Sequence, residues 1–167
     1  MTRLGQHPDP SHTIAHFSDP HLLAGARRLY GSVDTRAHLA DAIAQLERSE
    51  LKPDAIVFTG DLADLGEPDA YEHLRDLVQP AAERMGSELI WVMGNHDERA
   101  PYASALFGDA GQDGAGANAP QDRVYDVNGL RVVVLDTSVP GYHHGALLPS
   151  QLDWLRDVLA TPAEHGT

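Results

Sequence analysis

The sequence predicts an α/β fold whose sheet is largely parallel. Three short apolar runs, Ile14–Ser18, Ala55–Thr59 and Leu89–Met93, have the length and the β-branched or aromatic content of buried strands. Segments with the apolar spacing of helices separate them, so the order is strand, helix, strand, helix, strand. This alternation is typical of right-handed crossovers, which place the strands side by side in one sheet.

The two connecting segments carry helical patterns with recognisable ends. The first helix is expected to begin at Thr35, since a threonine hydroxyl can cap the backbone N–H groups of a first turn. The second is expected over residues 69–84, and Gly86 is placed to end it. The apolar residues that we expect to face inward are Leu39, Ile43, Leu46, Leu74, Leu77 and Val78.

Beyond the third strand the pattern changes from crossover units to a hairpin. Arg123–Val127 and Leu130–Leu135 have strand character, and Asn128-Gly129 between them favours a two-residue turn. The remaining elements that we expect are a short helix, a mobile surface loop and a final helix, over Tyr102–Phe107, Gly108–Asn118 and Leu147–Leu159. The final helix would carry its apolar side at Leu152, Leu155 and Leu159.

The composition is that of a globular protein, and it narrows the possible partners. The 167 residues suffice for one domain with a core, which we expect over residues 13–167 after a loose tail at residues 1–12. The formal net charge of −13 argues against stable nucleic-acid binding, which needs Lys and Arg against the phosphates. A small phosphate ester stays compatible, because bound metal ions can reverse the local potential.

Three absences in the sequence shape the remaining expectations. The chain has no cysteine, so disulfides and thiolate metal sites are excluded. It shows neither a secretory signal nor an apolar stretch long enough to span a membrane. A cytoplasmic location without a transmembrane segment is therefore the expectation.

Short polar motifs follow each of the three predicted strands: Asp19-Pro20-His21, Gly60-Asp61 and Gly94-Asn95-His96-Asp97. The carboxyl ends of parallel strands meet at one edge of a sheet, which is where ligands bind in open α/β folds. The side chains that we expect to converge there are Asp19, His21, Asp61, Asn95 and His96. Oxygen and imidazole donors of this kind suit divalent metal ions.

Each motif also has a plainer explanation when it is taken alone. An Asp-Pro turn with an exposed histidine would account for Asp19 and His21, and a simple turn would account for Gly60-Asp61. An asparagine-based turn with a surface histidine would account for Gly94–Asp97. Their occurrence at three successive strand ends favours the metal site.

Several residues are candidates for the surroundings of this site. Asp64 could accept a hydrogen bond from a ligand histidine, or it could cap the following helix. Asp97 could orient the His96 ring through its second nitrogen. His143 and His144 could line the site or stand as solvated loop residues. Elsewhere we expect one hydrogen-bonded core histidine and two solvated loop arginines, at His16, Arg27 and Arg28.

Together these motifs resemble those of the calcineurin-like metallophosphoesterases. The family pattern is Asp-x-His, Gly-Asp, Gly-Asn-His-(Asp/Glu), a later His, and Gly-His-x-His; the first three blocks match the three motifs above. Longer segments, Phe58–Asp64, Trp91–Asp97 and Val134–Gly141, are similar to the class III cyclic-nucleotide phosphodiesterase branch. The similarity covers nearly the whole chain from about residue 13.

The resemblance implies the N-terminal half of a metallophosphoesterase β-sandwich flanked by helices. It also implies a phosphodiesterase for 3′,5′-cyclic nucleotides, in which a hydroxide bridging two metal ions (Mn, Fe or Zn) attacks phosphorus. The implied ligands are Asp19, His21 and Asp61 for one ion, and Asp61 with Asn95 for the second. By the same resemblance, Asn95 and His96 are the catalytic residues, and His143 lines the substrate site. His96 would either stabilise the phosphoryl oxygens or donate a proton to the leaving oxygen.

The later His block and the Gly-His-x-His block of the family are absent from this sequence. We therefore expect the N-terminal portion of a longer enzyme, with weak metal binding, reduced activity and exposed apolar surface that promotes homo-oligomers. Two alternatives stay open. One is a phosphohydrolase of another substrate class, and the other is a non-catalytic metal-binding or interaction fragment.

Overall fold

The computed structural model describes residues 10–108 and 118–167, and it confirms the α/β prediction. The central sheet has three parallel strands in the order β1 (Ile14–Ser18), β2 (Ala55–Thr59) and β3 (Glu88–Val92). The helices that connect and follow these strands are α1, α2 and α3, over Thr35–Arg48, Pro68–Met85 and Arg99–Phe107. All three strands therefore point their carboxyl ends toward the same edge of the sheet.

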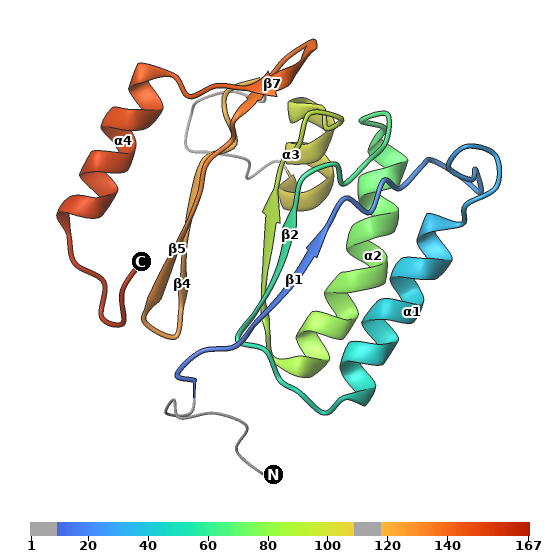
Figure 1. Ribbon diagram of the computed structural model, residues 1–167, viewed down its shortest axis with the longest axis horizontal. Helices are drawn as coiled ribbons and strands as arrows, with labels where there is room; N and C mark the ends of the chain where they lie inside the picture. The colour runs from blue at the N-terminus through green and yellow to red at the C-terminus, as the bar shows by residue number, and fades with distance from the viewer. Residues whose placement is uncertain (1–9, 109–117) are drawn as a thin grey trace.

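The second part of the chain adds two antiparallel hairpins and a helix. β4 (Arg123–Val127) pairs with β5 (Leu130–Val134), as the sequence predicted, and β6 (Ser138–Val139) pairs with β7 (Tyr142–Gly145). Helix α4 (Pro149–Ala160) completes the described fold. Figure 1 shows α1, α2 and α3 on one side of the central sheet, the β4–β5 hairpin on the other side, and α4 beyond that hairpin.

Alternation along the strands explains these layers, because successive side chains point to opposite faces of a sheet. Ile56, Phe58 and Trp91 face the helices and belong to the main core, in which the Phe58 ring stacks on Phe17 with centroids 5.0 Å apart. Ala55 and Ile90 face the other way and pack with Val127 and Val134 of the hairpin. The central strands are thus buried on both faces.

The outer face of β1 is the exception, and it corrects one prediction. Ile14, His16 and Ser18 occupy that face and are exposed, whereas the adjacent strands are covered by the β4–β5 hairpin. His16 is hydrogen-bonded, with Nε2 lying 2.6 Å from Thr59 Oγ1, but it is not a core residue. The expectation of a buried histidine was wrong because the hairpin covers β2 and β3 and not the edge strand.

Local chemistry sets the ends of the elements. Helix α1 is capped by Asp34, whose carboxylate accepts a bond from the Ala37 amide, and not by Thr35. The Thr35 hydroxyl instead donates to the His21 carbonyl at 3.2 Å. Gly86 ends α2 at φ 72°, as predicted, because a left-handed residue there costs a glycine little.

Helix α4 forms where the sequence predicted a final helix, but most of its apolar side is exposed and Leu155 is only half-buried. Leu148, Leu152 and Leu159 are 51%, 39% and 50% exposed. The buried residue of this helix is Gln151, whose amide donates to the Asp136 carbonyl and the Asp122 carboxylate. The apolar stripe of α4 is consequently a surface feature of the described chain.

Parts of two predictions lie outside the described residues. These are positions 1–9 of the expected N-terminal tail and positions 109–117 of the expected surface loop. Across residues 10–108 and 118–167, none of the helices combines the length and apolar character needed to cross a lipid bilayer.

Candidate metal centre

The loops after β1 and β2 continue side by side beyond the ends of their strands. The Asp19 amide donates to the Gly60 carbonyl at 3.2 Å, and the His21 amide donates to the Asp61 carbonyl at 3.0 Å. The Gly60 amide in turn donates to the Val92 carbonyl at the end of β3. This ladder holds the three motif-bearing loops in register at one edge of the sheet.

Glycine is required where the second and third loops meet. A Cβ on Gly94 would lie 2.3 Å from both the backbone nitrogen and Oδ1 of Asp61, distances that real Cβ atoms do not reach. Gly60 adopts φ 72°, which a glycine adopts without steric cost. The glycines of both motifs therefore allow the carboxylate of Asp61 and the 94–97 loop to occupy neighbouring space.

Asp19, His21 and Asp61 form a group whose ligand atoms lie within 4.8 Å of one another. His21 Nε2 lies 3.7 Å from Asp61 Oδ2. All three residues have positive φ, at 53°, 42° and 47°, which is uncommon for residues with a side chain. Such strain concentrates at functional sites. Two carboxylates and an imidazole, held close by strained backbone, fit a divalent cation.

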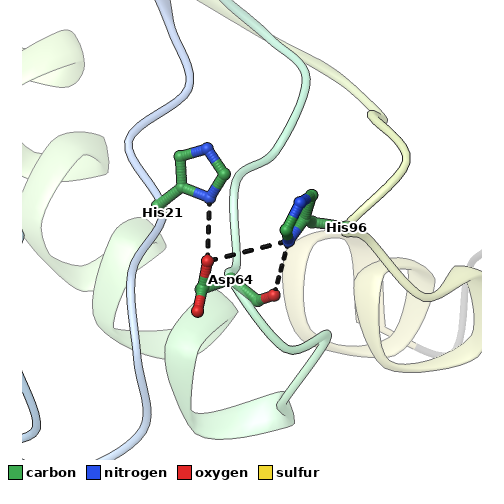
Figure 2. Close-up of side chains that lie close together, drawn as sticks. All are labelled: His21, Asp64 and His96. Carbon is green, nitrogen blue, oxygen red and sulfur yellow. Dashed lines mark hydrogen bonds and ion pairs between the residues drawn. The ribbon is translucent and has the colours of Figure 1, made fainter. Parts of the chain in front are cut away.

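Asp64 links the two histidines of the motifs, as Figure 2 shows. His21 Nδ1 donates to Asp64 Oδ1 at 3.1 Å, and His96 Nδ1 donates to the Asp64 carbonyl at 2.8 Å. These bonds leave Nε2 of each ring as the nitrogen that can meet an ion or a substrate. Of the two alternatives for Asp64, the structure places its carboxylate against the His21 ring, while Glu67 occupies the N-cap of α2.

The His96 ring is held in a position that favours its charged form. The hydrogen bond to the Asp64 carbonyl raises the pKa of His96, and the carboxylates of Asp61, Asp64 and Asp97 add to this effect. The His96 amide also donates to Asp61 Oδ1 at 3.0 Å. A histidine with a raised pKa is suited to donate a proton or a hydrogen bond to an oxygen that becomes negative.

Asp97 does not orient the His96 ring, contrary to the expectation from sequence. Its carboxylate is buried and accepts bonds from the amides of Leu62, Ala63 and Gly94, and from the Tyr71 hydroxyl at 3.0 Å. Burial raises the pKa of Asp97, although these hydrogen bonds act in the opposite direction. The residue joins the second and third loops through their backbones and supports the site indirectly.

His143 approaches the site from β7, far along the chain. Asn95 Nδ2 donates to His143 Nδ1 at 3.1 Å, and the His143 and His96 ring centroids are 6.4 Å apart. This bond turns the Asn95 carbonyl oxygen away from His143 and leaves it available as a ligand. His144 is exposed, with its ring 5.3 Å from the Tyr142 ring, so the structure brings only the first of the two histidines to the site.

The two loop arginines stay on the surface, as expected. Arg27 pairs with Glu67 and Arg28 lies 3.6 Å from Asp34, and the side chains of both arginines are at least half exposed. The sequence reasoning missed Tyr71 and Arg99, which reach the supports of the site through Asp97 and Asp136. No spacing signal marks either residue, because both act through contacts between distant segments.

Comparisons with known proteins find relatives that align with nearly the whole chain. A cAMP/cGMP dual specificity phosphodiesterase of Mycobacterium tuberculosis is 55% identical over 165 residues, which cover 99% of this chain and 50% of that protein. A 3′,5′-cyclic adenosine monophosphate phosphodiesterase of Pseudomonas aeruginosa is 35% identical over 159 residues, covering 94% of this chain and 53% of that protein. The chain spans about half the length of the curated relatives it matches.

A solved structure shares the fold. The dimetal phosphatase from Danio rerio superposes with a TM-score of 0.61 at 18% sequence identity, over 91% of this chain and 66% of that chain. The Calcineurin-like phosphoesterase family model matches residues 12–166. Since this match spans nearly the whole sequence, the chain belongs to the calcineurin-like phosphoesterase family, whose members use a dinuclear metal centre.

Proposed function

We propose that this chain carries the metal-binding part of a metal-dependent phosphodiesterase that acts on 3′,5′-cyclic nucleotides. The observation that carries the proposal is the convergence of Asp19, His21 and Asp61, whose ligand atoms lie within 4.8 Å of one another at the carboxyl edge of the sheet. The 55% identity to a dual specificity cyclic-nucleotide phosphodiesterase supports the substrate class. The negative net charge is compatible with a small ester when cations occupy the site.

The donor set divides naturally between two ions. Asp19, His21 and Asp61 would hold one, and Asp61 with Asn95 would hold the second. Bound ions of this kind supply activated water and positive charge for the phosphoryl oxygens. We propose Mn, Fe or Zn, since carboxylate, imidazole and amide donors accept each of them.

The side chains around the proposed metal ions have distinct roles. His96 presents Nε2 toward the phosphoryl group, because Nδ1 is engaged by the Asp64 carbonyl. Its raised pKa keeps a proton available for the leaving oxygen. Asn95, fixed by its bond to His143, keeps its carbonyl oxygen in the site, and His143 then lies where it can line the substrate pocket. Asp64 fixes the His21 ring, and Asp97 fixes the loops beneath it.

Metal binding and hydrolysis test this function separately. Calorimetric titration of the purified chain with Mn²⁺ should show binding that is lost in Asp61→Asn and retained in Asp41→Asn, a change on the exposed face of α1. Hydrolysis of cAMP, cGMP, an aryl phosphodiester and an aryl phosphomonoester should then show a preference for the cyclic nucleotides, and His96→Ala should abolish it.

The outcomes distinguish the alternatives. Binding without hydrolysis of any ester would favour a non-catalytic metal-binding module, and a preference for the monoester would favour another substrate class. Hydrolysis that persists in both Asp61→Asn and His96→Ala would reject the proposed site.

The assembly state is also a proposal. We propose that the chain forms homo-oligomers, because Leu152 and Leu159 of α4, Leu148 just before it and Ile14 of β1 are exposed apolar side chains. Sedimentation velocity should show a species larger than one chain, and Leu152→Glu should shift it toward the monomer. A monomer at all concentrations would refute this part. The cytoplasmic location expected from the sequence stays a prediction.

A further inference from the structure

Arg99 connects the beginning of α3 to the root of the β6–β7 hairpin. Its Nε donates to Asp136 Oδ2 at 2.8 Å, and the same guanidinium donates to the Ser138 carbonyl at 2.9 Å and the Asn118 carbonyl at 3.2 Å. The Arg99 side chain is only 14% exposed. Because the guanidinium presents its donors in a rigid planar fork, these three bonds fix its orientation.

Asp136 completes the connection from the other side. Its carboxylate is 1% exposed and, besides Arg99, accepts bonds from the amide of Gln121 and from the amide and hydroxyl of Ser138. Both charges of this pair are therefore hydrogen-bonded, the carboxylate fully buried and the guanidinium largely so. Removal of one partner from such a pair leaves an uncompensated buried charge, so the arrangement resists displacement.

The ion pair and the site share the same two segments of chain. Arg99 follows the 94–97 loop by two residues, and Ser138 is the first residue of β6. At the far end of this hairpin, His143 accepts its bond from Asn95. The loop and the hairpin are thus joined at two places, once through buried charges and once at the site. Figure 1 shows β7 at the same end of the molecule as the carboxyl ends of β1, β2 and β3.

A cavity of about 240 Å³ lies between these segments. Asn95 and Arg99 line it from one side, and Ser138, Pro140 and Gly141 line it from the hairpin. A shift of the hairpin would therefore change both the position of His143 and the space beside Asn95.

We propose that Arg99 is a positioning residue, whose ion pair with Asp136 holds the β6–β7 hairpin so that His143 meets Asn95. The catalytic consequence rests on the proposed function, whereas the positioning itself rests on the geometry alone. In this proposal Arg99 acts by holding the hairpin.

Distance measurements between spin labels test the positioning without any activity. The chain has no cysteine, so labels attach only at the introduced pair Tyr142→Cys on β7 and Glu72→Cys on the exposed side of α2. Arg99→Gln should broaden and shift the distance distribution of this pair. The matched control Arg84→Gln removes an exposed ion pair with Glu47 and should leave the distribution unchanged.

A second label pair separates positioning from loss of the fold. Glu72→Cys with Arg36→Cys reports the packing of α2 against α1 and should stay narrow in Arg99→Gln. If Arg99→Gln broadens the distance distributions of both label pairs, Arg99→Lys is the deciding variant. Lysine keeps the charge but not the planar fork of donors, so Arg99→Lys should broaden the distribution of the hairpin pair alone. An unchanged hairpin pair in Arg99→Gln, or broadening of both pairs in Arg99→Lys, overturns the inference.

Kinetics supply the catalytic readout. With a cyclic nucleotide, Arg99→Gln should lower kcat by about 100-fold, the order expected for misplaced groups, with partial recovery in Arg99→Lys. A broadened hairpin with unchanged kcat and KM would overturn the catalytic consequence of the positioning. If the parent chain hydrolyses no ester, the proposed function fails, and the label distances still decide the inference.

Discussion

Gly94 lies so close to Asp61 that no side chain fits between them. A Cβ at this position would lie 2.3 Å from the Asp61 carboxylate and 2.8 Å from the Cα of Gly60. We predict that Gly94→Ala displaces the Asp61 loop, destabilises the fold by about 1–3 kcal/mol through overpacking, and weakens Mn²⁺ binding at least about 10-fold. Urea unfolding and calorimetric titration measure the two effects.

Gly25→Ala is the control for the glycine substitution. Gly25 has φ +64°, and a Cβ built there would have no atom within 4 Å outside the adjacent residues, so a methyl group meets only backbone strain. This variant should lose about 1–2 kcal/mol of stability and keep its metal affinity. Equal Mn²⁺ affinity in Gly94→Ala and the parent chain would show that the close approach does not govern the site.

The buried carboxylate of Asp97 provides the second prediction. Asp97→Ala leaves the amides of Leu62, Ala63 and Gly94 without their acceptor, at a cost of about 1–3 kcal/mol for each buried group that stays unsatisfied. We expect loss of at least about 3 kcal/mol of unfolding free energy in urea and weaker metal binding, since both loops lose their common anchor.

Tyr71→Phe is the milder companion to this change. It removes the hydroxyl bond to Asp97 and the acceptor of the Glu98 amide, keeps the three amide bonds to Asp97, and should cost about 1–3 kcal/mol. If Asp97→Ala were no more damaging than Tyr71→Phe, the carboxylate would not be the anchor of these loops.

Much of the fold was predictable because local patterns and global packing agree. The parallel strands, the crossover helices and the Asn128-Gly129 hairpin all formed as the sequence predicted, with Asn128 at φ 52° and Gly129 at φ 86°. The failures have a common cause. His16 and the leucines of α4 follow buried-type patterns, but which face of an element is covered depends on tertiary neighbours that spacing does not reveal.

The candidate site also has a part that the sequence predicts and a part that it does not. Asp19, His21 and Asp61 follow strand ends, so topology alone predicts that they meet. The supporting contacts were less predictable: Asp97 bonds loop backbones and not the His96 ring, and Arg99 bonds a residue far along the chain. Side chains that act by joining distant segments leave no periodic signal in the sequence.

Asp64 tests the role of a group that holds a ligand without being one of the proposed ligands. Its carboxylate accepts from His21 Nδ1, whereas His96 bonds its backbone carbonyl, so Asp64→Ala removes the first contact and keeps the second. Loss of such partners lowers metal affinity by about 10–100-fold, and we expect a loss of this size in a Mn²⁺ titration.

Two variants sharpen the Asp64 test. Asp64→Asn keeps an acceptor for the His21 ring and should recover part of the affinity. Asp76→Ala removes a carboxylate that is 65% exposed and paired with Arg75, and it should have no effect. Parent-like affinity in Asp64→Ala would mean that the His21 ring needs no support from this carboxylate.

Asp54 predicts a pH dependence at the opposite edge of the sheet. Hydrogen bonds from the Thr13 amide and the Asn128 side chain lower the pKa of Asp54 from its ordinary value of 3.8. A carboxylate that binds its proton more weakly in the folded state stabilises the fold above pH 3.8, and this contribution disappears as the pH falls through the lower pKa of the folded state.

Asp54→Asn should therefore be less stable than the parent chain at pH 6, and the difference in unfolding free energy should close toward pH 2. Asn128→Ala removes one donor to Asp54, so the pH-dependent part of its stability difference should be smaller, on top of a pH-independent cost of alanine at φ 52° in the turn. Asp41→Asn on the exposed face of α1 should show no pH-dependent difference. Urea unfolding at several pH values measures these differences; a gap between Asp54→Asn and the parent chain that stays constant from pH 6 to pH 2 would contradict the linkage.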